Sequence, residues 1–427
     1  MRAKIGIAAA LIALAGCEEH QQNQAPAPAG APELRGAVSD PRVAQFYEAR
    51  GWRSAWTPES EAALTAAIGG AERHGLDKDG FLQPIQAARS PAAHDAALSL
   101  AALSYAEALA RGRTDPARIR RVYTVPRPEP DLAAELNGTL RRGNIADWLG
   151  GLAPRDDDYR LLSQAYVQAN QQVARAQGHP PRPVLERART LAVNLERRRW
   201  LERAPPATRI DVNTGAATLA YVRDGKVADT RRVVVGEPGH ETPELGSPLY
   251  RLVANPTWTV PRSIEAREIA PKGEAYLRRN NMARRDGWIV QESGPRNSLG
   301  LVKFDLRNDQ EIYLHDTPAK ALFARSDRHA SHGCVRVADA LGFAAMIAED
   351  QGVLGQWERA LATGEENFVP LVHPIAVRLF YHTAFVENGR IVFAPDIYGW
   401  DEDVAEALGL PRRSRHAARA AVTDLGP

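Results

Sequence analysis

Apolar residues recur with the period of an α-helix through the first half of the chain, from about residue 37 to residue 205. A capping residue followed directly by proline is typical of helix starts, and this pair occurs at Thr57-Pro58, Ser90-Pro91 and Asp115-Pro116. The segment 184–202 repeats leucine and alanine at three- and four-residue intervals. We therefore predict an all-helical domain over residues 37–205.

The pattern changes after Pro205-Pro206, where short runs of β-branched and aromatic residues alternate with turn residues. These runs predict strands over 209–212, 217–223, 227–236, 250–260, 288–292, 300–306 and 311–315. One helix is predicted over 338–350, and Asn388-Gly389 indicates a hairpin between strands at 378–387 and 390–395. We predict a mostly antiparallel β domain over residues 206–400, and an α+β fold for the chain as a whole.

Two segments depart from these patterns. Residues 261–296 lack strand alternation and are rich in arginine and glutamate, which predicts an inserted, mobile helical element beside the β core. Residues 401–427 predict a C-terminal helix followed by a basic tail.

The amino terminus has the features of an export signal. Arg2 and Lys4 precede an apolar stretch at 5–15, which is too short to span a bilayer but suits a signal peptide. The stretch ends in Leu14-Ala15-Gly16-Cys17, which resembles a bacterial lipobox. We expect a lipoprotein signal peptide over 1–17 with lipidation at Cys17, although ordinary cleavage with an incidental cysteine is the alternative. Residues 18–36, rich in Gln, Ala and Pro, predict a disordered tether.

Composition narrows the class of protein. The formal net charge is +2, with 54 basic and 52 acidic residues, so no nucleic-acid partner is expected. The chain has 2 cysteines, which excludes a disulfide scaffold and a four-cysteine zinc site. With Cys17 assigned to the lipid, Cys334 is left as a single thiol that needs an explanation.

Cys334 lies in Ser331-His332-Gly333-Cys334-Val335-Arg336, a polar stretch with neighbouring histidines. Three interpretations are open. Cys334 could be a small buried hydrophobe, or His315, His332 and Cys334 could bind zinc. It could also be a nucleophile whose proton is taken by a histidine, with a thiol pKa lowered by an electropositive setting. In that case Gly333 leaves room for substrate, and backbone N–H groups around Gly333 and Cys334 could stabilise an oxyanion.

The segments His315-Asp316-Thr317-Pro318 and Ser331–Arg336 together resemble the signature of the L,D-transpeptidases of bacterial cell walls. The resemblance extends to other segments that match the larger, scaffold-bearing branch of that family: Asn194–Arg197, Val233–Gly236, Thr242-Pro243, Asn255–Trp258, Val260-Pro261 and Gly300–Phe304. It covers residues 190–400 strongly and the helical region weakly.

The resemblance implies a role for each matching residue. Cys334 would be the nucleophile, His315 the general base and acid, and the backbone carbonyl of Asp316 the group that orients His315. His332 and Gly333 would shape the oxyanion and substrate site. Substrate-binding roles are expected for four further residues: Ser331, Arg336, Tyr313 and Trp288. For Ser331 and Arg336, support of the loop is the alternative. Spacing alone does not decide which histidine is the base.

The insertion at 261–296 corresponds in this family to a substrate-capping segment. Its arginines and aromatic residues would suit an acidic peptide, and a solvated charged loop is the alternative. The chain departs from larger members in one respect, because the linker 177–183 leaves no room for a peptidoglycan-binding module. Substrate would then be held by the catalytic domain and its cap.

The family implies an acyltransferase that acts on peptidoglycan stem peptides and needs no cofactor or metal. Cys334 would form a thioester with a donor tetrapeptide, release D-alanine and transfer the acyl group to an acceptor amine. Such an enzyme is expected to be acylated by some β-lactams of the carbapenem type. The alternatives are an L,D-carboxypeptidase or D-amino-acid exchange enzyme with the same site, and a non-catalytic lipoprotein that binds stem peptides.

The expected location is the periplasm of the cell envelope, with the membrane reached through the lipid on Cys17. Glu18 follows that cysteine in place of the aspartate associated with inner-membrane retention, so the outer membrane is favoured.

Overall fold

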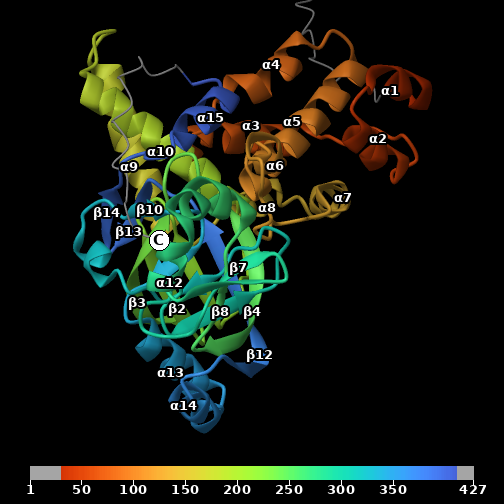
Figure 1. Cartoon of the computed structure of the whole chain (residues 1–427). Coiled ribbons are helices and arrows are strands. Elements are labelled where there is room, and N and C mark those ends of the chain that lie inside the picture. Colours follow the sequence, from red (N-terminus) through yellow and green to blue (C-terminus); the bar gives the residue numbers. More distant parts are fainter. Residues whose placement is uncertain (1–29, 411–427) are drawn as a thin grey trace, which may run out of the picture.

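The computed structural model describes residues 30–410, and its first half is helical, as predicted (Figure 1). The helices of this half are α1 (Ala31–Ala37), α2 (Pro41–Glu48), α3 (Pro58–Gly69), α4 (Asp79–Ala87), α5 (Pro91–Arg111), α6 (Pro116–Ile119), α7 (Leu132–Arg142), α8 (Ile145–Leu152), α9 (Asp157–Arg175) and α10 (Arg182–Trp200). A short 3-10 helix, η1 (Ala71–His74), lies between α3 and α4. No described helix is long and apolar enough to cross a membrane.

Local sequence explains the helix starts. The side chains of Thr57, Ser90 and Asp115 each accept a hydrogen bond from a backbone N–H in the first turn, at the three predicted starts. α5 is mostly buried and rich in alanine, which lets neighbouring helices approach closely. It forms the centre of the helical core.

The predicted tether is wrong at its carboxyl end. α1 lies within the last part of 18–36 and continues to Ala37, and Leu34 at its centre is fully buried in the helical core. Burying one leucine stabilises a short helix that composition alone does not support. The signal peptide, Cys17 and the rest of the tether lie outside the described residues, as does the basic tail beyond residue 410.

The second half is built on a nine-stranded sheet in the order β10-β3-β11-β9-β8-β4-β12-β1-β2. Its strands are β1 (Arg209–Asn213), β2 (Thr218–Arg223), β3 (Lys226–Gly236), β4 (Leu245–Ala254), β8 (Val302–Leu306), β9 (Leu314–His315), β10 (His329–Ser331), β11 (Val335–Val337) and β12 (Asn367–Phe380). β3 also pairs with β2, so the sheet closes on itself. Most pairs are antiparallel, as predicted, but β1–β12, β9–β11 and β3–β10 are parallel.

Several predictions for this half need correction. The strand predicted over 250–260 divides into β4 and β5 (Trp258–Thr259), because Asn255 has a φ of 47°. The strand at 311–315 shortens to Leu314–His315, because Glu311 has a φ of 55° and breaks the extended backbone. Arg378 belongs to the long sheet strand β12, and the Asn388-Gly389 hairpin joins only β13 (Ala384–Glu387) to β14 (Arg390–Phe393). A second helix, α14 (Leu354–Ala362), follows α13 (Ala340–Asp350), and its Trp357 packs in the sheet core.

Residues 261–296 form a cap beside the sheet, and the cap is not only helical. It contains α11 (Arg262–Ile264), a π-helical turn η2 (Glu265–Ile269), a 3-10 turn η3 (Ala270–Lys272) and α12 (Gly273–Arg279). A separate three-stranded sheet, β5 (Trp258–Thr259), β7 (Trp288–Gln291) and β6 (Met282–Arg285), supports these turns. A small apolar core that includes Trp258, Ile269 and Leu277 holds the cap together.

The helical half is joined to the second half through α10, which packs against α15 (Trp400–Ala407). Arg197 of α10 pairs with Asp401 at 2.5 Å, and both side chains are buried. The Asn194 side chain donates to the Thr383 hydroxyl at 2.8 Å and accepts from the Thr383 N–H at 2.9 Å. This ion pair and these hydrogen bonds all cross the interface, so they hold the two halves in one arrangement.

Candidate active site

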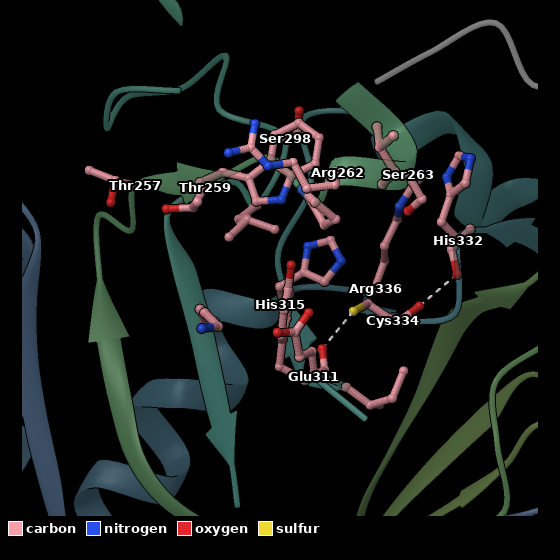
Figure 2. A pocket seen from close by; sticks show the side chains of 18 of the residues that line it. Thr257, Thr259, Arg262, Ser263, Ser298, Glu311, His315, His332, Cys334 and Arg336 are labelled. Carbon is pink, nitrogen blue, oxygen red and sulfur yellow. Dashed lines mark hydrogen bonds between the residues drawn. The ribbon is translucent and has the colours of Figure 1, made fainter. Parts of the chain in front are cut away.

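A cavity of about 1040 Å³ lies between the nine-stranded sheet and the cap. Figure 2 shows His315, Arg336 and Cys334 lining its lower part, with Arg262 and Ser263 of the cap at its upper part. Sequence motifs that lie far apart along the chain therefore meet in one pocket.

His315 lies on the short strand β9 and is 5% exposed. Its Nδ1 lies 2.5 Å from the backbone oxygen of Asp316, as expected for the orienting group. A carbonyl oxygen can only accept, so Nδ1 carries the proton and Nε2 is left as a proton acceptor. Burial, helped by the positive charge of Arg336, lowers the pKa of His315 to about 3, so the ring is neutral near pH 7.

Asp316 is itself held in place by both neighbouring segments. Its Oδ2 accepts from the Leu301 N–H at 3.0 Å, and its Oδ1 pairs with Lys320. The Asp316 N–H donates to the Val302 carbonyl at 2.9 Å. The carbonyl that orients His315 therefore belongs to a residue fixed by three contacts.

Cys334 follows β10 and precedes β11, in the loop 332–334 that we call the catalytic loop. β11 pairs with β9 in a register that sets Arg336 opposite His315. The Cys334 thiol points to the Glu311 carbonyl, with Sγ and O 3.7 Å apart. Cys334 and His315, the expected nucleophile and base, thus lie on or directly beside neighbouring strands and line one pocket.

The expectation of a lowered thiol pKa is wrong for this structure. Burial raises the pKa of the Cys334 thiol above its usual range, and this effect exceeds the lowering by hydrogen bonds from Tyr313 and by Lys303 and Arg336. His315 does not supply the positive charge, because its ring is neutral. The free site therefore contains a neutral thiol and a neutral imidazole.

Ser331 and Thr242 hold the catalytic loop from both sides. The Ser331 hydroxyl donates to the Cys334 carbonyl at 2.6 Å and accepts from the Gly333 N–H at 3.2 Å. The Thr242 hydroxyl donates to the Gly333 carbonyl at 2.8 Å and accepts from the Gly236 N–H at 2.9 Å. Gly333 has a φ of 113°, a conformation that favours glycine. Ser331 therefore supports the loop in this structure.

These contacts also narrow the candidates for an oxyanion site. The Gly333 N–H is already used by Ser331. The Cys334 N–H has no hydrogen-bond partner within residues 30–410. Of the two backbone donors expected here, Cys334 N–H is the one available to substrate.

His332 lies at the rim of the pocket and not beside the buried His315. Its Nε2 is 2.7 Å from Oε1 of Glu268, a residue of the π-helical turn in the cap. Its ring also lies 5.0 Å, centroid to centroid, from that of His240. His332 is thus a contact between the catalytic loop and the cap.

The other expected substrate-binding residues all line the pocket. Arg336 is buried on β11, close enough to affect the pKa values of both His315 and Cys334. The Tyr313 ring packs edge-to-face on His315, with centroids 5.6 Å apart. Trp288 is 39% exposed in the cap, and the Arg262 guanidinium lies 3.8 Å from its ring centroid.

Three residues of the site were not given roles by sequence reasoning. Lys303 and Thr242 fall inside family-like segments, but nothing in their local pattern assigns Lys303 to the pocket or Thr242 to the Gly333 carbonyl. Glu268 lies in the charged cap, where one glutamate among many carries no distinguishing signal. The zinc set of His315, His332 and Cys334 is not assembled, since the described residues that could share a metal ion are Glu237, His240 and His332.

Comparison with known families places this site in a class. Residues 207–354 match the L,D-transpeptidase catalytic domain, and residues 41–165 match a scaffold domain. Residues 207–354 therefore belong to the L,D-transpeptidase catalytic domain family, and a scaffold domain precedes them. The resemblance noted in the motifs is confirmed at the level of the family and fold.

A Haemophilus influenzae protein provisionally named as an L,D-transpeptidase is 28% identical over 306 residues, 66% of this chain. The match spans 60% of that protein's length. A solved L,D-transpeptidase from Mycobacterium smegmatis is 16% identical, covering 40% of this chain and 58% of its own, with a TM-score of 0.24. An Enterococcus faecium L,D-transpeptidase mutant is 13% identical, covering 42% and 53% of the two chains, with a TM-score of 0.23. The fold assignment rests on the family match and on the elements described above.

Proposed function

We propose that this chain is a peptidoglycan L,D-transpeptidase that cross-links stem peptides through a thioester on Cys334. The proposal is supported above all by the buried His315, whose Nδ1 is held by the Asp316 carbonyl and whose Nε2 is left as a proton acceptor in the pocket that Cys334 lines. A protein that only binds stem peptides has no need of an oriented base in the same pocket as a thiol.

In the acylation step, Cys334 Sγ attacks the carbonyl carbon of the third residue of a donor tetrapeptide. Because thiol and imidazole are both neutral at rest, His315 Nε2 takes the thiol proton as the C–S bond forms. The Cys334 N–H and the Tyr313 hydroxyl are the candidate donors to the oxyanion. The imidazolium returns its proton to the leaving nitrogen, and D-alanine departs.

In the second step, the side-chain amine of an acceptor stem attacks the thioester carbonyl. His315 accepts the amine proton and returns it to the sulfur, so the thiol is regenerated and an amide cross-link forms. The cavity of about 1040 Å³ is larger than most small-molecule sites, which favours an acceptor peptide over water in this step. We also propose that β-lactams of the carbapenem type acylate Cys334 by the same attack.

The test uses the chain carrying Cys17→Ala, incubated with disaccharide-tetrapeptides and analysed by mass spectrometry. Cross-linked dimers with loss of D-alanine are expected, and Cys334→Ala should abolish them. Tripeptides without dimers would replace the proposal by an L,D-carboxypeptidase, and exchange of the terminal D-amino acid would identify an exchange enzyme. No product at all would support the non-catalytic alternative.

We further propose that the protein is anchored in the periplasm by a lipid on Cys17, in the outer membrane. This proposal rests on the Leu14-Ala15-Gly16-Cys17 sequence and on Glu18. Membrane fractionation of cells that express the intact chain and its Cys17→Ala variant tests it. Release of the variant into the soluble periplasmic fraction is expected, and continued membrane retention would contradict the anchor.

A further inference from the structure

Glu237, His240 and His332 bring their side chains together at the rim of the catalytic pocket. One ligand atom from each lies within 4.8 Å of the other two. The three side chains are 28%, 38% and 31% exposed, so an ion could reach them from solvent. None of the three is the proposed nucleophile or base.

The backbone fixes this grouping. The turn that follows β3 is closed by the His240 N–H, which donates to the Glu237 carbonyl at 2.9 Å. The Glu237 N–H in turn donates to the Ser331 carbonyl at 2.8 Å, which joins the turn to the segment that carries His332. The His240 and His332 rings are tilted at 56°, so they converge without stacking. The side chains therefore meet because two hydrogen-bonded turns lie side by side.

One atom of this group is unsatisfied. His240 Nδ1 is buried and has no hydrogen-bond partner among the described residues. The Glu237 carboxylate lies 3.5 Å from it without hydrogen-bond geometry. A buried ring nitrogen without a partner is uncommon in proteins and calls for a specific explanation.

We propose that Glu237, His240 and His332 form a binding site for a divalent transition metal of the zinc class. Two imidazoles and one carboxylate are an established ligand set for tetrahedral Zn²⁺, with the fourth position left to water. Nitrogen ligands disfavour Mg²⁺ and Ca²⁺, which take oxygen ligands. The ion gives the buried Nδ1 of His240 a partner.

The site competes with the contact between the catalytic loop and the cap. Glu268, which pairs with His332 at 2.7 Å, lies outside the three-residue group. The proposal places the ion on Nε2 of His332, the nitrogen that Glu268 now contacts, so that the ion displaces Glu268 and releases the cap at this point. If the proposed transpeptidase activity holds, the metal lowers that activity by altering the rim of the pocket.

Metal binding is tested on the full chain carrying Cys17→Ala and Cys334→Ala, which removes both thiols. Co²⁺ titration should produce the visible absorption of a four-coordinate nitrogen–oxygen site, and Zn²⁺ should displace it. Adding His240→Ala or Glu237→Gln should weaken Zn²⁺ binding by more than about tenfold. Loss of a residue that only supports a metal ligand already weakens binding by about that factor, and these variants remove a ligand itself. The matched controls Glu241→Gln and His373→Ala should leave affinity unchanged.

The Glu268→Gln variant should change Zn²⁺ affinity in the opposite direction. Removing the competing carboxylate charge should tighten Zn²⁺ binding, whereas loss of a ligand would weaken it. Equal affinities in the parent chain and in His240→Ala would overturn the proposal, as would metal binding that appears only when Cys334 is present. These spectroscopic measurements do not require catalytic activity. Metal binding can therefore be confirmed or excluded even if the proposed transpeptidase function is wrong.

Activity then tests the consequence. In a chain that retains Cys334, Zn²⁺ should slow cross-linking, and His240→Ala should shift the inhibition to higher Zn²⁺ by the same factor as it weakens binding. If Zn²⁺ inhibits the His240→Ala variant as strongly as the parent chain, the inhibition comes from binding to the Cys334 thiol. That result would overturn the proposal that Zn²⁺ inhibits through Glu237, His240 and His332.

Discussion

The nine-stranded sheet is flanked by the helical scaffold and by the cap, and it contacts these two regions differently. Toward the scaffold, Arg197 and Asp401 form a buried pair, and Arg120 pairs with the buried Glu244 at 3.2 Å. In the cap, arginines 49–57% exposed pair with glutamates across short elements. Removing one partner of a buried ion pair strongly destabilises a protein, whereas an exposed ion pair contributes little to the free energy of unfolding. The scaffold is therefore a fixed support for the sheet, and the cap is the adjustable side of the pocket.

The two histidines of the motif follow the same division. His315 is buried in the sheet and held neutral by its surroundings. His332 is at the rim, where its contact is a carboxylate of the cap. Because His315 is buried and His332 is partly exposed, the first is held as a neutral ring in the sheet and the second contacts the cap.

The largest expected effect is on the sheet side. His315→Gln should lower kcat/KM for cross-linking by about 10²–10⁴-fold, because it removes the only oriented base of the proposed mechanism. His332→Gln, at the rim, should cost less. A larger loss for His332→Gln than for His315→Gln would reverse the assigned roles, and circular dichroism of both variants would check that they fold.

The buried interface with the scaffold comes next. Asp401→Asn should lower the free energy of unfolding by about 3–5 kcal/mol, because the buried Arg197 then loses the carboxylate with which it pairs directly. Urea denaturation measures the change. Glu402→Gln on the same helix, at a partly exposed pair with Arg189, is the matched control and should cost far less. Equal losses would show that the buried pair is not special.

Acid should destabilise the sheet side through its buried histidines. Burial lowers the pKa of His315 to about 3 and that of His382 well below its usual range. The unfolded chain therefore binds protons first as the pH falls below about 6.5, and the free energy of unfolding decreases with falling pH. From pH 6.5 to 4.5 the loss through His315 is about 2–3 kcal/mol.

Denaturation at several pH values measures this slope. His382→Gln should reduce the slope, and His373→Gln, which removes an exposed histidine, should leave it unchanged. Because His315 stays neutral, acidification to pH 5 should not abolish activity through this residue while the protein remains folded. Loss of activity with an apparent pKa near 6.5 would contradict a neutral buried base.

Removing the hydrogen bonds of Thr242 to the catalytic loop should lower stability by a smaller amount. Thr242→Val removes the donor to the Gly333 carbonyl and the acceptor for the Gly236 N–H, which should cost about 1–3 kcal/mol of stability. Cross-linking should fall as the loop loses its geometry, and Thr242→Ser should restore most of it. Failure of serine to restore activity would point to methyl packing and not to the hydroxyl.

The smallest effect is expected in the cap. Arg284 bridges Glu265 and Glu274 at 3.3 Å while remaining 49% exposed. Arg284→Gln should change stability by about 0.2–1 kcal/mol or less. A loss comparable with that of Asp401→Asn would remove the distinction between a fixed scaffold interface and an adjustable cap.

Much of this arrangement could be predicted from local sequence. The capped helix starts at Thr57, Ser90 and Asp115 and the Asn388-Gly389 turn depend on neighbouring residues, so their pattern is sufficient. The short β9, by contrast, depends on a backbone break at Glu311, and α14 depends on packing against the sheet. Residues 282–285 gave no strand pattern because β6 pairs only within the small cap sheet.

Sequence alone determined the change from helices to strands near residue 205, the family of the β domain, and the candidate residues Cys334 and His315. Tertiary structure decided how those residues behave. Burial made thiol and imidazole neutral, Ser331 took the Gly333 N–H, and Glu268 of the cap became the partner of His332. The physical reason is that desolvation and hydrogen-bond partners come from segments far apart along the chain, which no local pattern records.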